Sequence, residues 1–548
     1  MVWSIDPVQI PPPETDTPPV VSQEIDLIGS HQGQRRWRLL ADQAQFRGQQ
    51  QVFDQGAHGF FYGSTETSRD PNEPLISSQE LSWQAGHALY DANQDILTLS
   101  QEVQVTSPDG DQLTTATMQV QPGEKLDLPE SFILKNDQMQ LQGQSGSYWV
   151  NESRLDAAQG RLTLTHPGDD TVVVSADQLH YDRTTQVAEG TGNLTIEQPG
   201  LTIQAPQGHY SRLEAQSVLQ GGVRLQEQRE LGTVLAQATS SPPEQEVSIT
   251  ADQLQYDRTT QIAQGQGNLL IEQGETRISA PQGTYKRRDS QSILVGGVTL
   301  QETERTLTAA RLNGNHRDKI FLFEENVLYR QQGDPDADGG STSELRRSET
   351  EVTANQLLYN SATETAFFTG NVEFVQRGRK AKANEAVVSP EQIVLTGAVV
   401  LEQIQGDWLA QRSEDPDVQE ALRQPTVIYA ERVEIDQATN DARFWQDVVV
   451  VQVNRAAEGD QATYKESTQV LELAAEATPV LLCDRGDPEP GAAVVSVANL
   501  PGRDALDATC RGANRIRSKL ITLDMEKNTF AAVGQSSMQF RVDEDSSL

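Results

Sequence analysis

The chain has 548 residues, with 79 Asp and Glu against 43 Lys and Arg, and its net charge is −36. A charge of this size is repelled by phosphate backbones and anionic membrane surfaces, which argues against nucleic-acid binding. Hydrophobic content is 36% and mean hydropathy is −0.54, which suits strands with one apolar and one solvated face better than a compact globule. No run approaches the ~18 apolar residues of a membrane-spanning helix, and residues 1–10 do not resemble a secretory signal.

Residues 10–19 are rich in Pro, which predicts a stiff, extended and disordered leader over residues 1–23. Residues 39–46 and 88–93 follow as diverged copies of an element that becomes clear further along the chain. That element is a repeat. Residues 175–228 return as residues 250–303 at an offset of 75, and 34 of the 54 positions are identical. A fixed period indicates one supersecondary unit stacked on itself.

The repeat unit has the pattern of β-strands. Leu179 and Tyr181 alternate with polar residues, and so do Leu194 and Ile196, with Gly, Asn, Asp and Pro at the ends of each run. Period-2 alternation over short runs predicts half-buried strands, and no long stretch shows helical spacing. Weaker copies follow at 353–374, 429–464 and 520–524. The sequence therefore predicts an all-β fold of stacked antiparallel strand repeats, with atypical units at the two ends.

Cys483 and Cys510 flank a stretch rich in Pro, Gly and Asp. They have no C-x-x-C spacing and no neighbouring His, which argues against a metal site. In an oxidising compartment they would form a disulfide that closes this loop, and otherwise they are two separate buried thiols. Residues 237–246, 331–350 and 403–424 also interrupt the strand pattern and are interpreted as long loops.

Catalytic motifs are missing from the sequence: it has no G-x-S-x-G, no H-E-x-x-H and no phosphate-binding Gly-rich loop. Residues 334–339 fit the first half of a calcium loop, but the twelfth position is Leu345, so we interpret them as an acidic loop without metal. Asp177 and Asp252 recur at one place in the repeat, which favours a role in a turn or ladder over acid–base chemistry. We expect neither an enzyme nor a cofactor.

Alternation leaves two arrangements of the apolar faces open. They can close on each other as an ordinary sandwich core. They can also stay apart and line a trough that shields acyl chains, at ~0.8 kcal/mol per buried CH₂. Periodicity does not separate these two arrangements.

The repeats ADQLHYDRTTQVAEGTGNLTIEQ, ADQLQYDRTTQIAQGQGNLLIEQ, ANQLLYNSATETAFFTGNVEFVQ and APQGHYSRLEAQSVLQGGVRLQE resemble those of the OstA-like (LptA) family. Residues 24–126 are similar to LptC proteins, through RWRLLADQA at 36–44 and VQVTSPDG at 103–110. The resemblance implies an elongated, twisted open β-jellyroll in the periplasm that passes lipopolysaccharide acyl chains along without chemistry. It also implies partners: lipopolysaccharide, an inner-membrane transporter complex and an outer-membrane LptD-like translocon, bound by edge-strand stacking, with possible end-to-end self-association. LptC proteins carry an N-terminal membrane helix for which this sequence shows no apolar run.

The resemblance divides the chain into a leader (1–23), an LptC-like module (24–130), LptA/OstA-like β-jellyroll repeats (131–480), a Cys-flanked insertion loop (481–512) and terminal strands with a tail (513–548). The candidate groove-lining residues share the inward position of the alternation. They are Leu179, Tyr181, Leu194, Ile196, Ile203, Val223, Leu225, Leu254, Tyr256, Leu269, Ile271, Ile278, Val298, Leu300, Leu357, Tyr359, Val372 and Phe374. The alternative function is a structural or adhesive extracellular stalk of β-repeats without a lipid ligand. A parallel β-helix ranks third, because no period of 20–30 residues is present.

Overall fold

The computed structural model describes residues 20–31, 34–47, 49–62, 80–121, 125–150, 152–165, 171–227, 247–333, 348–376, 378–403, 426–452, 455–476, 478–485, 502–524, 527 and 529–540. Antiparallel β-strands make up nearly all of them, so the prediction of an all-β fold of stacked antiparallel strands is confirmed. Antiparallel pairing also excludes the parallel β-helix. The chain divides into two compact units, Met1–Thr260 and Gln261–Leu548.

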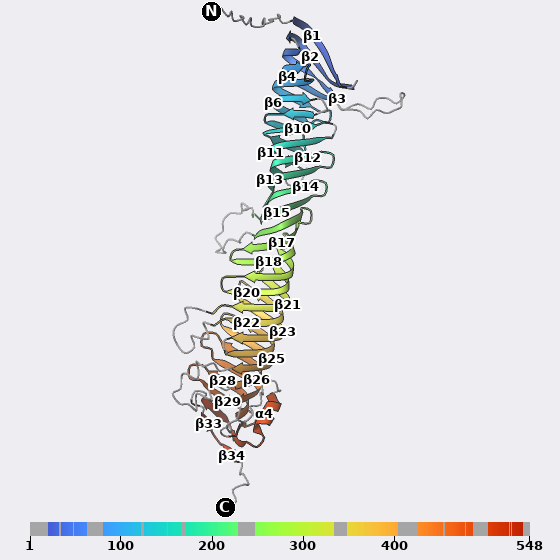
Figure 1. Ribbon diagram of the computed structural model, residues 1–548. Helices are drawn as coiled ribbons and strands as arrows, with labels where there is room; N and C mark the ends of the chain where they lie inside the picture. The colour runs from blue at the N-terminus through green and yellow to red at the C-terminus, as the bar shows by residue number, and fades with distance from the viewer. Residues whose placement is uncertain are drawn as a thin grey trace, which may run out of the picture. The chain divides into compact units, whose positions relative to one another are not determined.

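Unit 1 is a meander in which successive strands pair, except within residues 125–149, where the first of four short strands pairs with the fourth (Figure 1). Its strands are β1 (Val20–His31), β2 (Gln34–Arg47), β3 (Gln50–Tyr62), β4 (Glu80–Asp91), β5 (Ile96–Thr106), β6 (Gln112–Gln121), β7 (Lys125–Leu128), β8 (Phe132–Lys135), β9 (Met139–Gly143), β10 (Ser145–Trp149), β11 (Arg154–Leu164), β12 (Val172–Asp182), β13 (Val187–Gln198), β14 (Leu201–Ser211), β15 (Gln216–Glu227) and β16 (Val247–Asp257).

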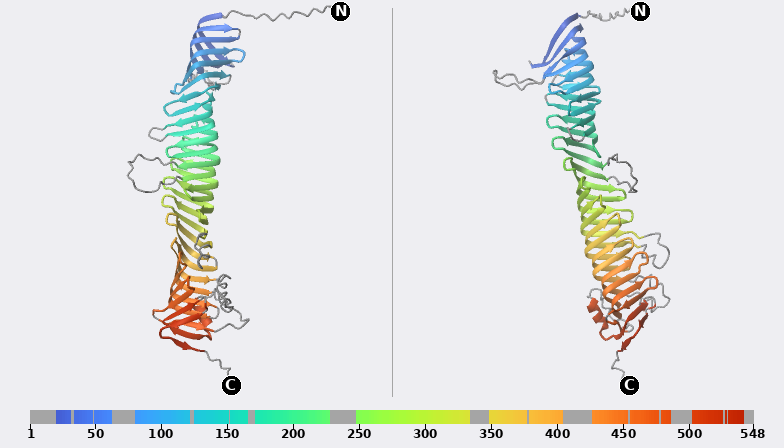
Figure 2. Two further views of the ribbon diagram at one scale, coloured as in Figure 1. Left: turned by 90° about the vertical axis from the view of Figure 1, so that its left-hand side faces the viewer. Right: turned by 180° about the vertical axis from the view of Figure 1, so that it is seen from behind.

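Unit 2 continues the same pattern and ends in shorter strands and a helix (Figure 2). Its elements are β17 (Ile262–Gln273), β18 (Thr276–Lys286), β19 (Gln291–Gln301), β20 (Arg305–Asn315), β21 (Ile320–Gln331), β22 (Thr350–Asn360), β23 (Thr365–Gln376), β24 (Arg379–Val388), β25 (Gln392–Gln403), β26 (Thr426–Asp436), β27 (Ala442–Gln452), β28 (Arg455–Lys465), β29 (Val470–Ala474), β30 (Val480–Asp484), α4 (Gly502–Cys510), β31 (Asn514–Ser518), β32 (Leu520–Asp524), β33 (Thr529–Val533) and β34 (Ser537–Gln539).

Most of the long strands change register near their middle. Between β13 and β14 the pairing shifts between Thr191 and Leu194. Gly192 and Asn193 form the bulge there, with φ values of 75° and 49°. An extra residue would turn every later side chain to the opposite face of a straight strand. Here the strand bends at the bulge instead, so Gly190 before it and Leu194 after it are both buried.

The bends divide each unit into two facing half-sheets. In unit 1, half-sheet A contains residues 172–176 of β12 and 194–198 of β13, and half-sheet B contains residues 178–182 and 187–191 of the same strands. In unit 2, residues 327–331 of β21 lie in half-sheet A and residues 320–324 in half-sheet B. We call the line of bends the spine. The turns at the far edges of the half-sheets are lip A and lip B, and the line along which the lips face each other is the seam.

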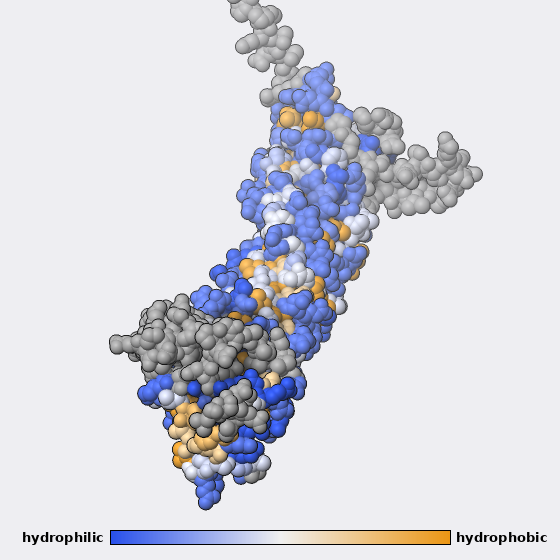
Figure 3. All heavy atoms as spheres, turned by 60° about the horizontal axis from the view of Figure 1, so that its bottom comes forward, coloured by the Kyte–Doolittle hydropathy of each residue, from blue (hydrophilic) through white to orange (hydrophobic). Residues whose placement is uncertain are grey.

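The core lies between the half-sheets. Trp37 of half-sheet A meets Tyr90 of half-sheet B edge-on, with ring centroids 5.0 Å apart. In unit 2, Tyr329 meets Phe368 in the same way at 5.5 Å. Figure 3 shows that the outer face it presents is mainly hydrophilic. The apolar faces of the strands therefore pack on each other, while the polar faces meet solvent.

Two local features differ from the strand–turn–strand pattern that the sequence predicts. Residues 502–510, within the predicted insertion loop, form helix α4, and residues 480–484 before them form β30. Leu506 and Ala505 of the helix pack against Val449 and Val451 of β27, so this part of half-sheet A is buried on both faces. The helix escaped prediction because one apolar stripe of nine residues is too short to show a helical period. Within the described part of the chain, no helix has the length and hydropathy to cross a membrane.

Candidate functional site

All eighteen predicted lining residues face the interior between the half-sheets of their own unit. None is more than 3% exposed. In half-sheet A of unit 1, Ile196 pairs with Ile203, which pairs with Leu225, so three of them form one ladder. Leu179 and Tyr181 lie on half-sheet B. The candidates therefore line both walls of an enclosed apolar interior.

The sequence analysis missed a group of buried aromatic residues in the interior of unit 2. Phe321 and Phe323 of β21 are at most 1% exposed, as are Tyr329 of the same strand and Phe368 of β23. Phe321 and Phe323 alternate with Ile320 and Leu322, which are also apolar, so the sequence shows a continuous apolar run and only the burial alternates. β21 lies outside the aligned repeat segments, so its alternation was not counted.

The interior is filled by its own side chains. Cavities of about 30, 30 and 20 Å³ lie among the described residues, each large enough for about one water molecule. Each is lined from both half-sheets beside the seam: Trp37 and Val120 line one, Leu81 and Tyr148 another. A wider hollow of about 940 Å³ lies near the bends of β5 to β11, with Gln104, Gln144 and Arg161 among its lining residues.

The seam is closed by side chains. Among the described residues, the backbone hydrogen bonds of turns and loops stay within one lip or lie at the spine. In unit 1 the guanidinium of Arg183, in the β12–β13 turn of lip B, forms an ion pair with Asp111 at the start of β6 in lip A. Arg212 of lip B donates to the side-chain oxygen of Gln138 at 3.2 Å and to the carbonyl of Thr165 at 3.4 Å, both in lip A.

Among the described residues of unit 2, two ion pairs cross from one lip to the other, and we call these contacts the first and second clasps. In the first clasp, Arg305 of lip A lies 2.6 Å from the carboxylate of Glu364 in lip B. Tyr359 of half-sheet B donates a hydrogen bond of 2.6 Å to Glu302 of lip A. Burial and this hydrogen bond raise the pKa of Tyr359, so its hydroxyl stays a donor. Burial likewise raises the pKa of Tyr329, which lies beside Arg305, to about 12.

The second clasp joins Arg379, at the start of β24 in lip A, to Glu466 in the β28–β29 turn of lip B. The two groups are 2.6 Å apart, and their side chains are 9% and 0% exposed. Gln469 donates to the Glu466 carboxylate at 3.0 Å, and Tyr464 donates to Gln469 at 2.8 Å. The second clasp is therefore fully desolvated and held by neighbours, whereas Glu364 of the first clasp is 51% exposed.

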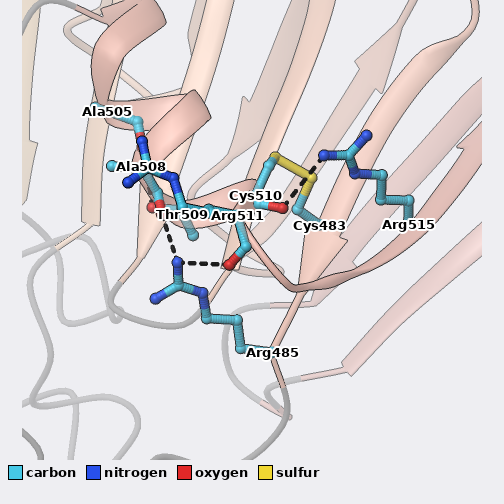
Figure 4. Close-up of a disulfide and its surroundings, with 8 residues drawn as sticks. All are labelled: Cys483, Arg485, Ala505, Ala508, Thr509, Cys510, Arg511 and Arg515. Atoms are coloured by element: carbon cyan, nitrogen blue, oxygen red, sulfur yellow. Dashed lines mark hydrogen bonds between the residues drawn. A yellow bond between two sulfur atoms is a disulfide. The ribbon is translucent and has the colours of Figure 1, made fainter. Parts of the chain in front are cut away.

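Cys483 and Cys510 form a disulfide that ties β30 to the end of α4 (Figure 4). Arg485 donates to the carbonyls of Ala508 and Arg511, and Arg515 donates to the carbonyl of Cys510. Tyr429 and Val449 of half-sheet A pack against the same cluster. The bond therefore fixes the helix that covers half-sheet A near the C-terminal end.

The remaining predicted features have structural roles or lie outside the described part. Asp177 accepts hydrogen bonds from Asn193 at 2.8 Å and Gln159 at 3.0 Å, so it braces a bulge as expected. Residues 334–339, predicted as an acidic loop, lie outside the described residues. Within those that are described, no group of three or more His, Cys, Asp or Glu could hold a metal ion.

Among the described strands, the first strand of unit 1 and the last two strands of unit 2 have one pairing each. β1 pairs with β2, and its Val20 and Val21 are 66% and 52% exposed. At the other end β33 pairs with β32 and β34 pairs with β31, and Phe540 beyond β34 is 67% exposed. These are the edges at which the sequence analysis expected strand addition.

Two segments of the chain match known protein families. Residues 1–126 match the family described as "Lipopolysaccharide-assembly, LptC-related". Residues 351–529 match the family described as "LptA/(LptD N-terminal domain) LPS transport protein". Both descriptions concern the assembly or transport of lipopolysaccharide.

Among solved structures, the chain is similar to LptH from Pseudomonas aeruginosa, described as the LptA homologous periplasmic component of the lipopolysaccharide transport device. The likeness has 17% sequence identity and a TM-score of 0.20, and it covers 23% of this chain and 82% of LptH. The chain has no match among curated proteins. On its two family matches, the chain is an LptA/LptC-like lipopolysaccharide-transport protein.

Proposed function

We propose that the chain is a non-enzymatic conduit that shields lipopolysaccharide acyl chains between half-sheets A and B. The observation that carries the proposal is the apolar lining of both half-sheets in each unit. Among the described residues, the half-sheets are joined at the spine by backbone and at the seam by side chains. The family matches support the class of lipid.

Binding an acyl chain requires the half-sheets to move apart. Each seam cavity holds about one water-sized group, so a chain of ten or more CH₂ groups has no space in the closed interior. Each buried CH₂ contributes ~0.8 kcal/mol, which offsets the loss of core contacts as the acyl chains replace them. The phosphates and sugars would remain in solvent, where salt screens their repulsion from a chain of net charge −36.

The proposed setting is the periplasm. An inner-membrane transporter complex would dock at one edge of the array and an outer-membrane LptD-like translocon at the other, each by strand addition. The exposed Val20 and Val21 on β1 and Met538 on β34 support these edges as docking surfaces, which also permit end-to-end self-association.

Photo-crosslinking at neighbouring positions tests the conduit. A photoreactive phenylalanine replaces Leu357, which is buried, or Leu358, which is 43% exposed on the same strand. The pair Phe368 and Phe367, buried and 37% exposed, repeats the comparison with nearly isosteric substitutions. We expect lipopolysaccharide adducts at 357 and 368 and none at 358 and 367. Equal yields at inward and outward positions would contradict the proposal.

A second candidate is a structural stalk without a lipid ligand. The filled interior favours it, because an ordinary sandwich core has the same burial. The same irradiation distinguishes the two functions: a stalk gives no lipid adduct at any of the four positions.

A further inference from the structure

We propose that acyl chains enter unit 2 sideways, through the section of the seam that the first clasp closes, and that the second clasp stays shut. This inference rests on the proposed conduit function. Three kinds of bonding hold each unit together: hydrogen-bonded ladders along the array, backbone at the spine, and side chains at the seam. Of these three, only the side-chain contacts at the seam can separate without breaking a strand pair or bending the backbone further.

The two clasps of unit 2 differ in the free energy that is needed to separate their ion pairs. Glu364 is 51% exposed, so its carboxylate can turn into water and keep its hydration when it leaves Arg305. Arg305 is 10% exposed, so this pair is stronger than a surface ion pair, but its exposed carboxylate is screened by salt, which lowers the free energy of opening it. Glu466 is fully buried and also binds Gln469, so separating it from Arg379 leaves two charges without partners in a dry interior. The seam should therefore open at the first clasp and remain closed at the second.

The first clasp stands directly in front of the aromatic part of the core. Arg305 lies beside Tyr329, whose ring contacts Phe368 from the opposite half-sheet at 5.5 Å. Tyr359 donates to Glu302 across the seam. Two residues before it on β22, Leu357 pairs with Phe368 of β23, so Tyr359 lies near the same ring. When Glu364 and Tyr359 separate from lip A, the space they leave leads to these rings. An acyl chain of an amphiphile fits such an opening, with its polar end outside.

Uptake of a fluorescent fatty-acyl probe by the full-length chain tests the entry site. The variants Glu364→Gln and Tyr359→Phe remove one cross-lip bond each with little change in shape. We expect each to speed uptake, and the double variant to speed it about tenfold, which corresponds to about 1.4 kcal/mol. The matched control is Glu351→Gln, because Glu351 pairs with Arg330 at 2.9 Å within half-sheet A. That control should leave the uptake rate unchanged.

Cross-linking the lips gives the opposite test. Cysteines at the exposed positions Thr303 in lip A and Thr363 in lip B, joined by a flexible bismaleimide, should slow uptake several-fold. The control joins Thr303 and Glu275, whose side chains lie 3.4 Å apart on the same lip. The native cysteines are paired with each other and do not react.

The outcomes separate this inference from the proposed function. If the wild-type chain takes up no probe, the conduit itself fails. If the wild type takes up the probe but Glu364→Gln, Tyr359→Phe and the cross-lip link all leave the rate at that of their controls, the conduit stands and the entry site is wrong.

Discussion

At the scale of single residues, the recurring positions of the repeat motif form the bends and turns of the strands. Gly192 and Asn193 both have positive φ, and a Cβ on Gly192 would lie 2.5 Å from a carboxylate oxygen of Asp177. Asp177 in turn binds Asn193. Asp182 accepts backbone hydrogen bonds from Thr184 and Thr185, and the bond from Thr185 contributes most to lowering its pKa. The recurring A-D, Y-D and G-N pairs are thus required by backbone geometry.

His316 gives a pH prediction at this scale. It is 2% exposed, donates to or accepts from the Ser292 hydroxyl at 2.8 Å, and lies edge-on to Tyr285 and Phe321. Burial lowers its pKa to about 4. The unfolded state then binds more protons between pH 6.5 and 4, so stability falls as the pH falls through this window.

The loss in unfolding free energy reaches up to about 3 kcal/mol at pH 4, from the size of the pKa shift. His316→Phe should remove this part of the acid dependence, at a small cost at pH 7 where Ser292 loses its partner. Hydrogen exchange of β20 and β21 amides in urea at several pH values measures it, with the exposed His58→Gln as control. Parallel profiles of His316→Phe and wild type would refute the assignment.

At the scale of the elements, each strand serves both half-sheets. The inward residues change parity at the bend in some strands, such as β12 with Val174 and Leu179, and keep it in others, such as β13 with Gly190 and Leu194. Turns therefore alternate between lip A and lip B along the chain. The clasps join turns that are several strands apart, such as the β23–β24 and β28–β29 turns of Arg379 and Glu466.

The second clasp predicts a large loss of stability from one substitution. Glu466→Gln leaves Arg379 buried without its anionic partner, and we expect unit 2 to lose about 3–5 kcal/mol of unfolding free energy. The double variant Arg379→Met, Glu466→Leu should recover most of it, because apolar groups of similar size replace both charges. Glu351→Gln, an exposed pair, should cost less than about 1 kcal/mol. Chemical denaturation checks this order, and equal losses in Glu466→Gln and Glu351→Gln would contradict it.

At the scale of the whole molecule, the strand repeat was predictable from the sequence. The packing of the two half-sheets against each other was not. Alternation such as Leu179-x-Tyr181 reports which side chains point inward, and all eighteen predicted residues do so. It does not report whether the two inward faces touch. Contacts between Arg305 and Glu364 escaped prediction because they join residues 59 positions apart on facing lips, and no local pattern encodes that pairing.

The most direct test of the account is whether lipid separates the half-sheets. Spin labels replace Arg330 on half-sheet A and Leu358 on half-sheet B of unit 2, both exposed, and the control pair Arg330 and Lys382 lies on half-sheet A alone. We predict that saturating lipopolysaccharide lengthens the distance of the first pair and leaves that of the control pair unchanged. A first-pair distance that stays the same with lipid bound would contradict the claim that acyl chains lie between the half-sheets.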